Sequence, residues 1–215
     1  ERVTSMVADG TTIYAGLGTT AGDAEVWKCT SCDSAPTWTK VGGDGTGSAG
    51  QSWATSTYEE VASLIIVNGT TLAVGLGTSA GDAELWTCAT SSCTVTTGWT
   101  KRGGDATGSG GQSWSNVTDE IRSMTSSGTV IYVGTGVTAG EADVWRCDLG
   151  GTCTTTSGWT QVGGDTLNTS WASSTYERVW SLVASGTTVY AGLGDGAGEG
   201  EVWKCVNCST SPSWS

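Results

Sequence analysis

The sequence predicts an all-β fold made of four repeated units, and two observations lead to this prediction. Units of the same pattern begin at Glu1, Glu59, Asp119 and Glu177, which are 58, 60 and 58 residues apart in a chain of 215 residues. Each unit contains four short β-rich runs, and we find no convincing amphipathic helix. Four antiparallel strands of about five residues, repeated with a period near 60, are typical of the blades of a β-propeller.

Each unit opens with an apolar run, which we expect to be its first strand. These runs lie at 3–7, 61–65, 121–124 and 179–183. After a short turn, such as Asp9-Gly10, a second β-rich run follows at 12–18, 71–77, 130–136 and 188–194. Two β-branched runs around an Asp-Gly or Asn-Gly turn indicate a hairpin.

The third run of the first unit is 21–27, and we expect the third strand there. It ends on a tryptophan that lies two residues before a cysteine in every unit. We expect this mid-strand tryptophan to belong to the core, as Trp27, Trp86, Trp145 and Trp203. The fourth strand is expected at Trp38-Thr39-Lys40-Val41-Gly42 and at the equivalent positions of the other units.

We predict one domain, 1–215, with blades at 1–58, 59–118, 119–176 and 177–215. The last blade is shortened, because the sequence stops at Ser213-Trp214-Ser215 within the fourth strand. Neither terminus has a spare strand to donate, so we expect a four-bladed ring closed mainly by side-chain packing, or a piece of a larger ring or assembly. An open β-solenoid is the alternative, but four short strands per unit favour a blade.

The units resemble bacterial β-propeller repeats, related loosely to the Asp-box (BNR) and kelch-like propellers. In Asp-box blades the hairpin between the third and fourth strands contains Ser-x-Asp-x-Gly-x-x-Trp, and its tryptophan is matched by Trp38, Trp99, Trp159 and Trp214. The rest of the motif is absent, and a pair of cysteines stands where the Asp-box turn would be. The resemblance covers all four units and implies the fold more than the function.

The composition disfavours several classes of function. The net charge is −12, whereas a phosphate backbone needs lysine and arginine, so we expect no nucleic-acid partner. The chain has no histidine, which removes the commonest general base and metal ligand. No run approaches the ~18 apolar residues of a membrane-spanning helix, so we expect no membrane insertion.

The eight cysteines fall two to a unit, as Cys29 and Cys32, Cys88 and Cys93, Cys147 and Cys153, and Cys205 and Cys208. The spacing from each cysteine to its neighbouring tryptophan is constant, and only the gap between the two cysteines varies, as expected for a loop tip. A disulfide at the neck of each loop explains both facts. Zinc would need fixed spacing, and a redox site would need a helix N-terminus. Disulfides predict an extracellular or cell-surface location.

Long glycine-rich linkers follow the fourth strands, and loops of this length are often functional. One hypothesis is a glycan site in each linker, with Trp53, Trp114 and Trp171 stacking on sugars. Hydrogen bonds to hydroxyl groups would then come from Asp44, Asp105, Asp165, Gln51 and Gln112. The alternative is that each tryptophan fills the gap between two blades and each aspartate caps a Gly-Gly turn.

Acidic pairs precede the third strands at Asp23/Glu25, Asp82/Glu84, Glu141/Asp143 and Glu199/Glu201. The spacing of two places each pair on one face of a strand. An exposed acidic face is one interpretation, and a Ca²⁺ site with backbone carbonyls is the other. No Asp-x-Asp-x-Asp-Gly loop occurs, and we predict no metal site and no cofactor.

An enzyme is not expected. A sialidase-like site would need an unsymmetrical cluster of arginine, tyrosine and acid, whereas Arg2, Arg122 and Arg178 lie at two phases of the repeat. The sequence therefore predicts a secreted or surface-displayed, lectin-like module that binds a glycan or a surface protein without catalysis. The alternative is a structural or adhesive repeat unit that assembles with other copies.

Overall fold

A computed structural model describes residues 1–43, 52–53, 58–79, 81, 83–104, 114, 120–151, 153–154, 157–164, 167, 170–171, 176–196 and 200–215. Every regular element in these ranges is a β-strand. The first unit contains β1 (Arg2–Asp9), β2 (Thr12–Gly18), β3 (Glu25–Thr30) and β4 (Thr37–Gly43). The second contains β5 (Glu60–Val67), β6 (Thr71–Gly77), β7 (Glu84–Ala89) and β8 (Thr100–Gly104). The third contains β9 (Ile121–Ser127), β10 (Val130–Thr135), β11 (Val144–Asp148) and β12 (Thr160–Gly163), and the fourth contains β13 (Val179–Ser185), β14 (Thr188–Leu193), β15 (Glu201–Val206) and β16 (Ser213–Trp214).

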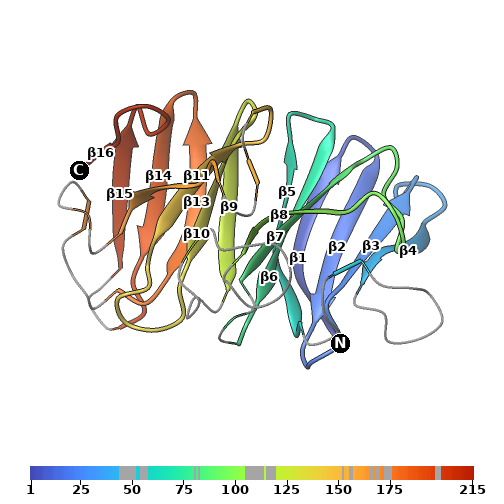
Figure 1. The fold of residues 1–215 in the computed structure, drawn as a ribbon. Coiled ribbons are helices and arrows are strands. Elements are labelled where there is room, and N and C mark those ends of the chain that lie inside the picture. Colours follow the sequence, from blue (N-terminus) through green and yellow to red (C-terminus); the bar gives the residue numbers. More distant parts are fainter. Residues whose placement is uncertain are drawn as a thin grey trace.

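Within each unit, the four strands pair in sequence order as an antiparallel meander. The first two meanders join into one eight-stranded sheet through a single pair, Gly18 with Glu60. An isolated bridge between Gly77 and Glu120 lies at the same position of the next junction. Figure 1 shows the units following one another across the molecule, with the two termini far apart. The predicted all-β fold with four strands per unit is confirmed.

The third strand begins later than the sequence predicts. In the first unit, β3 starts at Glu25, because the residues before it form a turn in which Asp23 N–H donates to Thr20 O over 2.9 Å. The Asp23 carboxylate also accepts from the hydroxyl groups of Thr19 and Thr20 at 3.0 and 2.8 Å. These hydrogen bonds, with Thr20 contributing most, lower the pKa of Asp23. A turn stabilised by an aspartate side chain therefore replaces the first residues of the expected strand.

Each first strand carries a β-bulge at the same position. One residue is skipped in the pairing with the second strand, because the register shifts between Val3 and Ser5 and at the equivalent positions of the other units. The four skipped residues, called here the bulge residues, are Thr4, Ala62, Arg122 and Trp180. A bulge breaks the period-two alternation of a strand and re-aims a side chain.

The core lies at the junctions between neighbouring units. A valine or isoleucine of β5, β9 and β13 packs against a glycine of the preceding unit, and no larger residue fits at the glycine. A Cβ atom on Gly16 would lie 2.5 Å from Val61 Cγ1, and one on Gly75 would lie 2.6 Å from Ile121 Cγ2. Gly134 faces Val179 in the same way, at 2.7 Å.

A hydrogen bond accompanies each of these contacts. Ser5, Ser63 and Ser123 each donate a hydroxyl proton to a carbonyl oxygen of the next first strand, at 2.9, 2.7 and 2.7 Å. The acceptors belong to the same residues that pack on the glycines, namely Val61, Ile121 and Val179. All three junctions therefore use one geometry.

The linker tryptophans Trp53, Trp114 and Trp171 complete these junctions. Their side chains are 3%, 2% and 0% exposed. Each indole N–H donates to an alanine carbonyl of its own unit, in Ala24, Ala83 or Ala142, at 2.9 to 3.0 Å. Each ring also packs edge-on against a tryptophan of the next unit, Trp99, Trp159 or Trp214, which lies in the fourth strand or immediately before it, with centroids 4.9 to 5.1 Å apart. The three tryptophans thus fill the space between units.

The eight cysteines form the four predicted pairs within units. Their Cα atoms are 5.8, 5.6, 5.4 and 5.6 Å apart in order along the chain, which is the range of disulfides. Four disulfides indicate an oxidising environment.

A closed four-unit ring is not seen. Val3 at the N-terminal end and Val202 at the C-terminal end are both exposed, so the two end units do not cover one another. In the described part of the chain, no helix has the length and apolarity to cross a membrane.

Candidate binding groove

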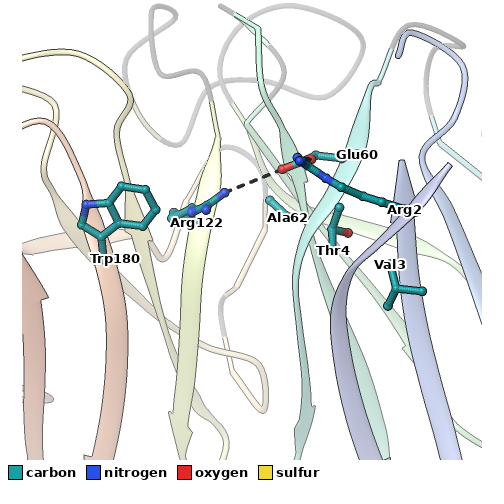
Figure 2. A pocket seen from close by; sticks show the side chains of 7 residues that line it. All are labelled: Arg2, Val3, Thr4, Glu60, Ala62, Arg122 and Trp180. Atoms are coloured by element: carbon teal, nitrogen blue, oxygen red, sulfur yellow. Dashed lines mark hydrogen bonds and ion pairs between the residues drawn. The ribbon is translucent and has the colours of Figure 1, made fainter. Parts of the chain in front are cut away.

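The first strands of all four units line one cavity of about 390 Å³. The first-strand groove, as it is called below, is lined by Arg2, Val3, Thr4, Glu60, Ala62, Arg122 and Trp180. These residues come from β1, β5, β9 and β13, and Figure 2 shows them side by side on neighbouring strands. Segments nearly 180 residues apart in the sequence therefore meet at one site.

The bulges explain how polar and aromatic side chains reach this groove. All four bulge residues line it, and each lies between a valine or isoleucine and a serine. Ser5, Ser63 and Ser123 donate to the next unit, and Ser181 holds the equivalent position in the last unit. Without the bulge, the strict alternation of side chains would place the valine and the serine of each first strand on the same face of the sheet. The groove residue therefore lies between the two residues used for packing at the junction, and Thr4 also donates to Val61 O over 2.7 Å.

A series of ion pairs runs along the groove from Arg2 to Asp195. Arg2 Nη2 lies 3.0 Å from Glu60 Oε2, and Arg122 Nη1 lies 3.7 Å from Glu60 Oε1. Glu120 Oε1 lies 3.8 Å from Arg122 Nε and 3.7 Å from Arg178 Nε, and Arg178 Nη1 lies 3.0 Å from an Asp195 carboxylate oxygen. Both glutamates are buried, whereas Arg2 is largely exposed. The buried carboxylates of Glu60 and Glu120 therefore fix the positions of the arginine side chains.

Trp180 lies beside this series of ion pairs and is 38% exposed. The guanidinium carbon of Arg122 lies 4.6 Å from the ring centroid, and that of Arg178 lies 5.1 Å away. Cations at these distances are attracted by the π-face of tryptophan. The groove therefore combines an exposed aromatic surface with guanidinium groups that have fixed positions.

The sequence interpretation missed Trp180, Glu60 and Ala62, because it expected a binding site in the linkers and not on the first strands. It also judged that the arginines lie at different phases of the repeat. Arg122 is a bulge residue, whereas Arg2 and Arg178 lie two positions before the bulge. Glu60 forms ion pairs with Arg2 and Arg122, and Glu120 forms ion pairs with Arg122 and Arg178. The two glutamates therefore connect arginines from both positions of the repeat. A signal was present in the sequence. At the bulge position the four units carry threonine, alanine, arginine and tryptophan, although the flanking positions hardly change.

The predicted linker sites fall in two groups. Trp53, Trp114 and Trp171 are buried, and no face of these rings is open for stacking on a sugar. Their observed position is that of the alternative interpretation, a filling between units. The polar partners proposed for them lie outside the described residues: Asp44, Asp105, Asp165, Gln51 and Gln112.

Local pairing replaces the predicted acidic face at Glu25 and Glu84, whereas Glu201 of the last unit is exposed. Glu84 is fully buried, and its carboxylate pairs with Lys101 and accepts from Trp86 Nε1 at 2.7 Å. Glu25 makes the same contacts with Lys40 and Trp27. Asp82 and Glu199 lie outside the described residues. Among the described residues, no three carboxylates or cysteines come together in a group that would hold a metal ion.

Comparison with known proteins adds no assignment. No protein-family model matches the chain. The curated proteins contain no match to it either.

Proposed function

We propose that this chain is a non-catalytic binding module that takes an acidic glycan in the first-strand groove. The observation that favours this function most is the exposed Trp180 beside Arg122, in a groove to which all four units contribute a side chain. The apolar face of a sugar ring packs on an aromatic surface, and a carboxylate takes charge-assisted hydrogen bonds from guanidinium groups.

The charge distribution supports an anionic ligand. The chain has net charge −12 and only five arginines, yet three of them lie in or beside this groove: Arg2, Arg122 and Arg178. Glu60, Glu120 and Asp195 balance the charge of these three arginines, whereas the rest of the chain is strongly acidic. The groove is therefore the place on the chain that repels an anion least. Arginine suits this role, because its planar fork binds a carboxylate with two parallel hydrogen bonds.

A binding role fits the groove better than catalysis. Glu60 pairs with Arg2 and Arg122, and Glu120 pairs with Arg122 and Arg178. Carboxylates engaged in this way position the arginines, whereas a glycosidase needs a pair of carboxyl groups that face the scissile bond. The disulfides favour a secreted or surface-displayed protein that meets its ligand outside the cell.

We also infer that the four meanders are blades of a β-propeller. Their first strands lie next to one another along the groove, as the innermost strands of blades do. The fourth strand of each unit is at the far end of the strand order from the first. Repeated junctions that bury the two faces of each sheet are the reason such repeats are stable.

The test is isothermal titration with a pair of oligosaccharides that differ only in a carboxylate, one sialylated and one without the sialic acid. We expect the wild-type chain to bind the acidic member and to bind the neutral one at least about tenfold more weakly, which corresponds to about 1.4 kcal/mol. Arg122→Gln and Trp180→Ala are expected to weaken binding of the acidic member by a similar factor, since each removes one contact.

Two control variants match these changes. Trp38→Ala removes another exposed tryptophan, and Lys204→Gln removes another exposed cation, and neither residue lines the groove. Both are expected to bind like the wild type. Equal affinity for the two oligosaccharides, or an equal loss in Trp38→Ala, would exclude the groove as the acidic-glycan site. A glycan array then identifies the preferred acidic sugar.

A further inference from the structure

The large exposed hydrophobic side chains of the described residues lie almost entirely on the two end units. Val3, Met6 and Trp38 lie on the face of the first unit that no preceding unit covers, which we call the head face. Val183, Val202 and Val206 lie on the last unit, on the opposite side, which we call the tail face. The remaining exposed side chain of this kind, Trp180, lies in the groove. Patches of this kind mark interaction surfaces.

The positions of Val3, Met6 and Val202 are covered where two units meet, although Leu182 at the position of Met6 is only half-buried. The position of Val206 is exposed in the first two units, at Thr30 and Ala89. Val3 is 55% exposed, but Val61, Ile121 and Val179 at its position are 0% exposed. Met6 is 58% exposed, whereas Leu64 and Met124 at its position are 7% and 6% exposed. On the other side, Val202 is 75% exposed, whereas Val26, Leu85 and Val144 are 0% exposed.

The two faces are complementary in shape as well as in polarity. At the three junctions, a valine or isoleucine of one unit occupies the space above a glycine of the unit before it. Gly192 is the corresponding glycine of the tail face, and a Cβ atom there would meet only Ser181, with no side chain from another unit. Val3 is the corresponding valine of the head face and is exposed. One face has the hole and the other has the side chain that fits it.

The hydrogen-bonding groups match in the same way. Ser5, Ser63 and Ser123 each donate to a carbonyl of the next first strand, and Ser181 stands at their position on the tail face. Its counterpart on the head face is the carbonyl of Val3. The head face also has an apolar cavity of about 260 Å³, which is lined by Val3, Ala15, Leu17, Trp27 and Trp38. In the second unit, the tryptophans equivalent to Trp27 and Trp38 are Trp86 and Trp99, and both pack against the linker tryptophan Trp53.

We propose that the tail face of one chain docks on the head face of a second copy and repeats the valine–glycine and serine–carbonyl contacts that already join the four units. Val3 of one copy fills the hole at Gly192 of the other, and the Ser181 hydroxyl donates to the Val3 carbonyl. A second copy is the occupant that fits, since every internal head face already packs on a tail face of this same repeat. A contact between two different faces is heterologous, so it produces a closed ring or a filament.

Sedimentation velocity of the 215-residue chain over a range of concentrations tests this proposal. The wild type is expected to form rings or filaments, whereas Met6→Asp, with a blocked head, and Val202→Asp, with a blocked tail, are each expected to be monomers. An equimolar mixture of the two variants is expected to give a dimer and nothing larger, because one variant keeps its tail face and the other keeps its head face. Thr11→Asp, in an exposed turn, is the matched control and assembles like the wild type.

Circular dichroism melting checks that the variants stay folded, and both substituted side chains are more than half exposed in the monomer. A wild-type chain that stays monomeric at all concentrations overturns the proposal. So does a mixture that stays monomeric, and so does a dimer of either variant alone, since that dimer would join like faces. The result is independent of the groove, because neither Met6 nor Val202 lines it.

Discussion

One shortened side chain makes the third unit different from the first two. In those units a glutamate accepts from the tryptophan two residues later and pairs with a lysine, as Glu84 does with Trp86 and Lys101. The third unit has Asp143 at the glutamate position, and this carboxylate accepts from Gln161 Nε2 at 2.8 Å. Trp145 Nε1 is buried without a hydrogen-bond partner. The missing methylene accounts for this orphaned donor.

Asp143→Glu is expected to provide the missing acceptor. A buried donor without a partner costs about 1–3 kcal/mol, so the variant should raise the free energy of unfolding by about 1 kcal/mol. For a chain of this size the melting temperature would rise by about 2–4 °C. Urea denaturation and calorimetry measure both. The mirror variant Glu84→Asp removes the acceptor of Trp86 and should destabilise; if Asp143→Glu also destabilises, the explanation for Trp145 is wrong.

Residue-scale detail of this kind was only partly predictable. The mid-strand position of Trp27, Trp86, Trp145 and Trp203 predicted core residues, but all four are only half-buried. The last three pack against the core clusters, whereas Trp27 lines the apolar cavity of the head face. The spacing of two within each acidic pair led us to expect an exposed acidic face. It could not show that Lys40 and Lys101 reach across from the fourth strand, because that contact depends on the register of two strands.

At the scale of elements, the linkers decide between two interpretations of their tryptophans, a glycan site or a filling between units. Trp171 is fully buried, donates to Ala142 O at 2.9 Å and lies 5.1 Å from the ring of Trp214. Trp171→Ala is therefore expected to lower the free energy of unfolding by about 3–5 kcal/mol. Trp38→Ala, at an exposed tryptophan, should cost much less in the same denaturation assay. A Trp171→Ala protein that keeps its stability but loses glycan binding would restore the linker as a ligand site.

The disulfide-bonded hairpins permit a second prediction at this scale. Cys88 and Cys93 close a short loop, with Cα atoms 5.6 Å apart. Replacing both with serine is expected to cost about 2 kcal/mol of stability, from the loss of chain entropy in the unfolded state. Native protein should have no thiol that reacts with a titrating reagent. Reactive thiols in the folded, unreduced protein would contradict both the pairing and the inferred oxidising location.

Strand order followed from the sequence, whereas the groove did not. The second strands were predicted at 12–18 and 71–77, and β2 and β6 have those bounds. Alternation of apolar residues and the Asp-Gly or Asn-Gly turns suffice for this result. A bulge leaves no such pattern, because it adds one residue that either strand face could accommodate. Arg122 and Trp180 therefore read as ordinary strand residues until the pairing of β9 and β13 was known.

For the whole molecule, the two proposed interactions differ in their response to salt. The affinity of Arg2 and Arg122 for an acidic glycan depends on charge attraction, so it should fall as the sodium chloride concentration rises. The reason is that the screening length falls from about 10 Å at 0.1 M to about 3 Å at 1 M. Head-to-tail assembly through Val3 and Val202 should persist, and sodium sulfate should strengthen it. Titration and sedimentation in the two salts measure these effects. Assembly that dissolves in sodium chloride would point to charge pairs instead of the apolar junction.

The bulge in each first strand has a consequence for how such a chain evolves. The bulge residue is skipped in the pairing with the second strand, so a substitution there leaves the register of the sheet unchanged. The side chains of Thr4 and Arg122 still contact the neighbouring unit, at Val61 O and at Glu60. A substitution at this position therefore changes the lining of the groove and these contacts together. Duplication or exchange of whole units would give the groove a new set of bulge residues, while the valine–glycine contacts between units would stay the same.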